Sequence, residues 1–255
     1  MEPVRPEFVP DPGLDRETME ALQRDIAEAA VFADDLGVDP AAVCATASGR
    51  ADGREAPLVA GVDQAFDGET AVSAVVVLES GAVVERAAAR VETEIPYIPG
   101  LLSFREGNSV LAAFEALECE PDVVLFDGSG RIHYRQAGLA THVGVTLDVP
   151  AVGVIKTLLC GTPRRPVDDP LPVGVRVPID PDADVEGPVD GPIGYALQTR
   201  QFEGSERHVN PLYVSPGHRV GAETAVDLAE RCCAGFKLPE PIRLADRHAG
   251  DLTAA

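Results

Sequence analysis

The sequence predicts an α/β fold, with a mixed sheet in which a three-strand antiparallel meander is followed by α/β units. Three runs of β-forming residues, separated only by Asp67-Gly68 and Ser80-Gly81, lie at residues 57–66, 70–78 and 82–91. Such close spacing with glycine-containing turns is typical of strands joined by hairpins. After residue 96, short apolar runs alternate with helical stretches, which is typical of α/β units.

The other elements follow from periodicity along the chain. Met19, Leu22 and Ile26 recur at three- and four-residue steps and predict an amphipathic helix from residue 15 to about residue 37. The later patterns predict helices at 109–117, 137–147 and 222–233, strands at 122–126, 151–155, 193–199 and 212–214, and a proline- and acid-rich connection at 163–190 with room for one strand. We expect a loose leader at 1–15 and a single domain at 16–255.

The charge balance is unusual. Forty-two acidic residues against 21 basic ones give a net charge of −21, and Lys156 and Lys237 are the only lysines. Such a balance normally repels nucleic acid phosphates. It also suits a cytosol of molar salt, where the Debye length is about 3 Å and surface charge barely acts on a ligand. We favour salt adaptation over an acidic partner surface, so the net charge does not exclude DNA or RNA.

Several functional classes are disfavoured. The sequence has no run of about 18 apolar residues and no secretory signal at its start, so we expect a cytoplasmic protein that does not enter a membrane. The five cysteines are odd in number and show no CxxC spacing, which argues against a zinc site or a disulfide framework. The motifs GxxxxGK[ST], GxGxxG and GxSxG are absent from the sequence.

Three carboxylates are candidates for a metal site. Asp63 is the only charged residue between Ala56 and Asp67, Glu106 ends the stretch YIPGLLSFRE, and Asp127 ends the apolar run VVLFD. Each could instead be a turn or helix-cap residue. If they meet on adjacent strands, their mutual repulsion requires a cation, and a few oxygen ligands that leave room for water favour Mg²⁺ or Mn²⁺.

Three further features could contact nucleic acid. Lys156 follows the apolar run AVGVI and could contact a phosphate oxygen, or it could be a surface lysine. His218, in YVSPGHRV, is predicted to be an accessible loop histidine able to transfer protons. The segment 97–100, Tyr-Ile-Pro-Gly, could insert into a base stack or be an ordinary tight turn.

Taken together, these segments resemble the endonuclease V family of deoxyinosine-specific nucleases. The resemblance runs from about Ala60 to Arg243 and rests on the stretches AGVDQAF, PYIPGLLSFREG, DGSGRIHYRQAGLATHVGV, VGVIKTLLCG, NPLYVSPGHRV and LPEPIR. It implies a ribonuclease-H-like fold and a DNA repair enzyme that uses Mg²⁺ or Mn²⁺. Such an enzyme cuts the second phosphodiester bond on the 3′ side of deoxyinosine, leaving 3′-hydroxyl and 5′-phosphate ends.

The resemblance also implies roles for individual residues. Asp63 and Asp127 match metal-binding aspartates, Glu106 a third catalytic acid, and Lys156 and His218 a catalytic lysine and histidine. The wedge that parts the strands corresponds to Tyr97, Ile98, Pro99 and Gly100, and the pocket for flipped hypoxanthine to Gly100, Leu102, Gly128 and His133.

The chain departs from the family pattern at three positions, Tyr134, Ile242 and Asp246; a histidine occurs in some relatives at the last of these. We interpret the departures at 242 and 246 as matters of stability more than of chemistry. We expect a monomer acting on inosine-containing DNA. The alternatives are an inosine-specific endoribonuclease and a non-catalytic hypoxanthine-binding protein of the same fold.

Overall fold

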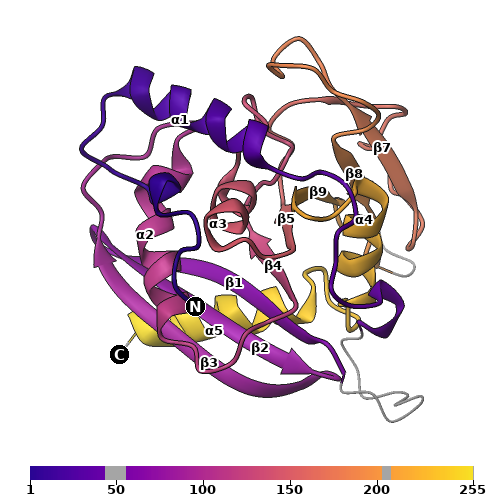
Figure 1. The fold of residues 1–255 in the computed structure, drawn as a ribbon. Helices are drawn as coiled ribbons and strands as arrows, with labels where there is room; N and C mark the ends of the chain where they lie inside the picture. Colours follow the sequence, from indigo (N-terminus) through magenta and orange to yellow (C-terminus); the bar gives the residue numbers. More distant parts are fainter. Residues whose placement is uncertain (44–55, 203–207, 255) are drawn as a thin grey trace.

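A nine-stranded mixed sheet forms the centre of the molecule (Figure 1). The computed structural model describes residues 1–43, 56–202 and 208–254. The strand order is β3-β2-β1-β4-β5-β9-β8-β7-β6. The strands are β1 (Leu58–Asp67), β2 (Thr70–Glu79), β3 (Ala82–Glu92), β4 (Val123–Asp127), β5 (Ala151–Ile155), β6 (Thr162–Pro163), β7 (Arg176–Asp180), β8 (Gly194–Leu197) and β9 (Leu212–His218).

The predicted meander is confirmed. β1 pairs with β2 and β2 with β3, both antiparallel, and the hairpin turns use the positive φ of Gly68 and Gly81. β1, β4 and β5 are parallel neighbours at the middle of the sheet. β9 runs antiparallel to β5 and begins the antiparallel half of the sheet, β9-β8-β7-β6. The carboxyl ends of β1, β4 and β5 therefore lie at one edge.

Helices cover both faces of the sheet (Figure 1). One apolar cluster joins Ala60, Val62 and Phe126 to α2 and α3, whereas the other joins Val59 and Leu125 to α4 and α5. Neighbouring residues of β1 thus bury their side chains on opposite faces, as strand geometry requires. The helices are α1 (Arg16–Ala29), α2 (Leu102–Glu115), α3 (Leu139–Leu147), α4 (Ala222–Arg231) and α5 (Glu240–Thr253), with 3-10 turns η1 (Pro6–Phe8) and η2 (Pro40–Ala42). No helix of the described residues is long and apolar enough to cross a membrane.

The N-terminal segment, expected to be a loose leader, is packed against α2 and α3. The Met1 ammonium group donates to the Phe114 carbonyl at 2.7 Å, and the amides of Val4 and Arg5 donate to the Thr146 carbonyl at 2.9 and 3.0 Å. Phe8 is buried. A proline-rich segment with only a short 3-10 turn can thus be fixed by hydrogen bonds to its backbone and by one apolar anchor.

Some elements differ from their predicted bounds. The first helix ends at Ala29, before residue 37, and α2 begins at Leu102, seven residues before the predicted start. The start of α2 was missed because its buried face carries the polar residues Ser103 and Glu106, which break the apolar pattern. α5 was not predicted, and the connection at 163–190 holds β7 and the end of β6.

Candidate active site at the carboxyl ends of the parallel strands

Asp63 and Asp127 lie next to each other on adjacent strands. β1 and β4 are parallel with Val62 opposite Phe126, so the following residues, Asp63 and Asp127, stand side by side. Asp127 is two residues after Leu125, whose side chain packs against α4 and α5. Asp63 is two residues after Gly61, which lies against the backbone of α5. Because side chains alternate along a strand, both carboxylates are directed to the face that α5 covers.

Burial and repulsion hold Asp63 in its neutral form at pH 7. Its side chain is 6% exposed, and its Oδ1 accepts one hydrogen bond, from the Gln64 amide at 2.7 Å. Its Oδ2 is buried without a hydrogen-bond partner. Burial first, and then the charge of Asp127, raise the pKa of Asp63 to about 8, against the opposing effects of the Gln64 amide and Lys156. Positive charge brought to this oxygen would be strongly favoured.

Lys156 completes a three-strand arrangement. It follows directly on β5, and its Nζ donates to Asp127 Oδ2 at 2.5 Å. Its side chain is half-exposed, so the ammonium group can also reach solvent or a ligand. Burial acts to lower the pKa of Lys156, but the hydrogen bond to Asp127 and the charges of Asp127 and Asp63 outweigh it and raise the pKa. The lysine is thus a permanent positive charge beside the two aspartates.

Glu106, on α2, is near enough to Asp127 to be affected by its charge. It lies on the second turn of this helix and is 6% exposed. Burial is the main cause that raises its pKa to about 7, and the charge of Asp127 acts in the same direction against Arg105. Asp63, Glu106, Asp127 and Lys156, predicted from four separate motifs, are therefore brought into one electrostatic site.

A fourth carboxylate belongs to this site although the sequence interpretation assigned it to stability. The charge of Asp246, on α5, acts on the pKa of both Asp63 and Lys156. α5 can lie this close because Gly61 has no side chain: a Cβ there would be 2.0 Å from the carbonyl carbon of Pro241. Asp246 lies away from the carboxylates in sequence, but in the fold its charge acts on Asp63 and Lys156. The helical spacing of Ile242, Ala245 and Ala249 was the signal that could have found α5.

His218 does not join the carboxylates, and the prediction of an accessible loop histidine is wrong. It is the last residue of β9 and is 1% exposed. Its Nδ1 accepts from the Val31 amide at 3.2 Å, and its Nε2 donates to Asp148 at 3.0 Å. Burial lowers its pKa. Because β9 is antiparallel to β5, His218 pairs with Ala151 at the start of β5. Lys156 follows the other end of β5, so the histidine and the lysine lie at opposite ends of this strand.

The predicted wedge is a tight turn with an exposed aromatic residue. The Leu101 amide donates to the Ile98 carbonyl at 3.0 Å across Pro99 and Gly100, whose φ is +80°. A proline followed by a residue with positive φ is typical of a type II turn. Tyr97, just before the turn, is 65% exposed. Its aromatic side chain is therefore available to a ligand.

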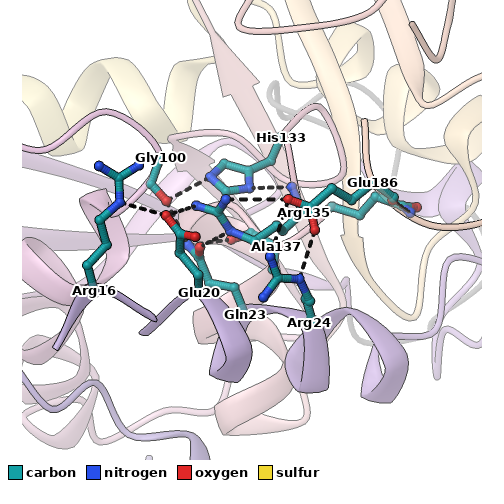
Figure 2. A network of polar contacts seen from close by, with 10 residues as sticks. Arg16, Glu20, Gln23, Arg24, Gly100, His133, Arg135, Ala137 and Glu186 are labelled. Atoms are coloured by element: carbon teal, nitrogen blue, oxygen red, sulfur yellow. Dashed lines mark hydrogen bonds and ion pairs between the residues drawn. The ribbon is translucent and has the colours of Figure 1, made fainter. Parts of the chain in front are cut away.

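Two of the predicted pocket residues, Leu102 and His133, adjoin this turn, and Gly128 lies at the end of β4. Leu102 begins α2 directly after it, and Gly128 follows Asp127 and is packed against Leu139. His133 is buried, and its Nε2 lies 3.1 Å from the Gly100 carbonyl oxygen (Figure 2). Gly100, Leu102 and His133 thus lie together at the start of α2, and the imidazole of His133 faces the protein backbone.

The residues present fit a divalent cation. Among the described residues no three His, Cys, Asp or Glu side chains are already assembled at metal-ligand distances. However, Asp63 has an orphaned buried oxygen beside a second carboxylate, and both groups are hard oxygen donors of the kind that Mg²⁺ and Mn²⁺ prefer. A cation would replace the repulsion between Asp63 and Asp127 with attraction.

Comparisons with known proteins identify the family. A family model described as endonuclease V matches residues 44–247. Endonuclease V of the halophilic archaeon Haloarcula marismortui is 60% identical over 264 residues, covering 99% of this chain and 97% of the relative. The crystal structure of Streptomyces avermitilis endonuclease V is 30% identical with a TM-score of 0.76, covering 98% and 96% of the two chains.

A further solved structure, from Ciona intestinalis, shares the fold at 23% identity and a TM-score of 0.69, covering 93% of this chain and 97% of that one. It is an endonuclease V in complex with a 24mer DNA containing an inosine followed by a ribo-adenosine. These structures confirm the ribonuclease-H-like fold. A match over almost the whole of both chains, added to the carboxylates and lysine gathered at one sheet edge, shows that this chain belongs to the endonuclease V family and is an endonuclease.

Proposed function

We propose that this endonuclease acts in DNA repair: it recognises deoxyinosine and cleaves the second phosphodiester bond on its 3′ side, leaving 3′-hydroxyl and 5′-phosphate ends. The observation that carries the proposal is the Asp63–Asp127 pair, with an unpartnered buried oxygen and Lys156 beside it. The complex of the Ciona relative with inosine-containing DNA supports the substrate class.

Asp63 and Asp127 would hold a Mg²⁺ or Mn²⁺ ion, and Glu106 and Asp246, whose electrostatic effects already link them to this pair, would act on its bound water. When bound, the ion would activate water and neutralise the charge on the leaving phosphate oxygen. The pKa values of about 8 for Asp63 and about 7 for Glu106 mean that both side chains must release protons when a cation binds. Glu106 could then accept a proton from the attacking water.

Lys156 would place its ammonium group on a phosphate oxygen of the scissile strand. Its Nζ already contacts Asp127, so a phosphate held there lies beside the carboxylate pair. A compact ammonium group can contact one oxygen without the fixed fork geometry of arginine. This is consistent with the presence of lysine here in a chain that otherwise uses arginine almost throughout.

Recognition would require the inosine to leave the helix. Hypoxanthine pairs weakly, so its extrusion costs less than that of a normal base. Tyr97 is the most exposed large apolar side chain of the described residues and would fill the space that the base leaves. The backbone around Gly100, Leu102 and Gly128 would then contact the edge of the flipped base.

Inosine-containing RNA is a second candidate substrate. The observation that favours it is the ribo-adenosine that follows the inosine in the DNA bound to the Ciona relative. The protein distinguishes the two sugars only through contacts to the 2′-hydroxyl group. Oligonucleotides of identical sequence with deoxyribose or ribose at and after the inosine would therefore separate the two activities.

The test is a nicking assay in about 1 M KCl, with inosine-containing and matched adenosine-containing duplexes, with Mg²⁺ or with a chelator. We expect a single cut, mapped by size, on the inosine strand only and only with the cation. Asp63→Ala and Asp127→Ala should abolish it. Binding of inosine DNA without any cut in Mg²⁺ or Mn²⁺ would favour the non-catalytic alternative, and a cut elsewhere would contradict the proposed position.

A further inference from the structure

The carbonyl oxygen of Gly100 is held by two buried side chains (Figure 2). Gln23 Nε2, from α1, donates to it at 2.9 Å, and His133 Nε2 lies 3.1 Å from it. Gln23 is 1% exposed and His133 is 3% exposed, so neither bond competes with bulk water. Gly100 is the third residue of the turn formed by Ile98, Pro99, Gly100 and Leu101, which we call the 98–101 turn.

The neighbours of His133 define its protonation. Its Nδ1 accepts from the Arg135 amide at 3.2 Å, so the proton must be on Nε2, which donates to Gly100. Burial, aided by the charge of Arg135, lowers the pKa of His133 to about 4 and keeps the ring neutral. Both ring nitrogens are thus used within the protein. His133 supports the 98–101 turn rather than contacting a base through its nitrogens.

Gln23 links the turn to two other segments. Its Oε1 accepts from Arg135 Nε at 2.8 Å, and its Nε2 also lies 3.3 Å from the Ala137 carbonyl oxygen. A neutral amide is the side chain that can donate to carbonyl groups at one end and accept from a guanidinium group at the other. The charge of Arg135, itself 8% exposed, is balanced by Glu20 and Glu186, each at 3.7 Å.

The same helix supports the turn through apolar contacts. Met19, on α1, is buried in a cluster with Leu101 and Phe104, against which Ile98 also packs. Tyr97, the residue before the turn, is 65% exposed. Tyr97 therefore directly precedes a turn whose backbone is held in place by contacts with α1. α1 precedes the residues matched by the family model, 44–247.

We propose that Gln23 is a positioning residue for strand separation: by holding the Gly100 carbonyl it keeps the 98–101 turn, and with it Tyr97, in the conformation that enters duplex DNA. The proposal rests on the proposed function. Without the amide, the turn would sample other conformations, and the apparent affinity for duplex would fall in proportion to the competent fraction. A single strand needs no separation, so its cleavage should be affected much less.

The first measurement needs no activity. Amide hydrogen exchange over residues 96–104 is compared in the parent, Gln23→Met and Gln23→Glu. Gln23→Met removes all polar contacts, whereas Gln23→Glu removes only the donors and keeps the acceptor for Arg135. Ile26→Val is the matched control, because it removes one buried methyl group from the same helix away from Gly100. We expect faster exchange in both Gln23 variants and parental exchange in the control; unchanged exchange in the Gln23 variants would overturn the proposal.

The second measurement compares kcat/KM on inosine duplex and on inosine single strand. In Gln23→Met, kcat/KM should fall about tenfold on duplex and less than about twofold on single strand. In Ile26→Val, kcat/KM should be unchanged on both substrates. In a Tyr97→Ala background, Gln23→Met should cause no further fall in kcat/KM on duplex, because both substitutions impair the same strand-separation step. Equal losses on both substrates, or additive losses in the double variant, would overturn the positioning role. A parent that cuts neither substrate would contradict the proposed function, while hydrogen exchange would still test the contact.

Discussion

Lys156 and Asp127 form an ion pair with 2.5 Å between Nζ and Oδ2, and this pair leaves the neighbouring Asp63 with a buried oxygen that accepts no hydrogen bond. The single positive charge of Lys156 is thus placed beside two carboxylates, Asp127 and Asp63. Burial first, and then the charge of Asp127, raise the pKa of Asp63 to about 8 in spite of this lysine.

Replacing Asp63 with asparagine should stabilise the metal-free protein at pH 8. The folded protein binds the Asp63 proton more tightly than the unfolded chain, because the pKa is raised from 3.8 to about 8. Stability is therefore lost as the pH rises through this window. Asp63→Asn should raise Tm at pH 8 by at least ~2–4 °C, the shift that about 1 kcal/mol gives at this size, and by less at pH 4.

The control for this experiment is Asp67→Asn on the same strand. Asp67 is exposed and makes only a 3.8 Å contact with Arg90, so its replacement should hardly change Tm. An Asp63→Asn protein that is less stable than the parent at pH 8 would show that the carboxylate is satisfied in the folded state.

The Mg²⁺ requirement of nicking should depend on pH. Asp63 and Glu106 have raised pKa values of about 8 and about 7, so a cation must displace their protons at lower pH. Between pH 6 and pH 8, the Mg²⁺ concentration for half-maximal nicking should fall with each pH unit by about tenfold for every proton that the cation displaces. Above pH 8 it should level off. Mg²⁺ titrations across this range measure it. A requirement independent of pH would mean that these protons are not linked to cation binding.

Removal of the Lys156 charge should impair the chemical step. Lys156→Met keeps much of the side-chain volume but takes away the ammonium group, and single-turnover nicking should slow by about 10²–10³-fold, as on removal of one preorganised donor. Lys156→Arg should restore it only in part, since a planar guanidinium group cannot occupy the same position. If Lys156→Met nicks at the parental rate, the contact with Asp127 is a surface ion pair only.

Tyr97→Ala should separate binding from chemistry. Stacking on an aromatic side chain contributes roughly 1–3 kcal/mol per base, so binding of inosine duplex should weaken by about one to two orders of magnitude. Single-stranded substrate should be affected much less. Asp127→Ala should do the opposite, with binding largely retained and cleavage lost on both substrates. Equal damage to duplex and single-strand cleavage by Tyr97→Ala would leave Tyr97 an ordinary turn residue.

His218→Ala should reduce stability and leave the rate of nicking unchanged at temperatures well below Tm. The substitution removes the acceptor for the Val31 amide and the donor to Asp148, and each lost hydrogen bond costs about 0.5–1.5 kcal/mol. Thermal unfolding and single-turnover nicking, measured on the same preparation, distinguish the two effects. A rate that drops with Tm unchanged would place His218 in the chemistry after all.

The parts of the fold that local patterns specify could be predicted. The hairpins of the meander have glycine at their turns, and the apolar runs of β4 and β5 can only be buried strands. Asp127 and Lys156 follow such runs directly, so their meeting at one sheet edge needed only the knowledge that these strands are parallel.

The parts that depend on long-range packing could not be predicted. The direction of β9 relative to β5 determines the position of His218, and nothing within YVSPGHRV specifies it. The charge of Asp246 acts on Asp63, 183 residues earlier in the chain, because α5 packs against β1. The contribution of Gln23 depends on where the 98–101 turn packs against α1. Sequence periodicity reports burial, but not which buried surfaces meet.

The bare backbone of Gly61 makes the spacing between Asp246 and the strand carboxylates a property of the main chain. α5 rests on β1 without an intervening side chain, so the separation is fixed by the contact of peptide groups. Any side chain at position 61 would have to push the start of α5 away from β1, so a substitution there would alter the carboxylate site from a residue that carries no charge.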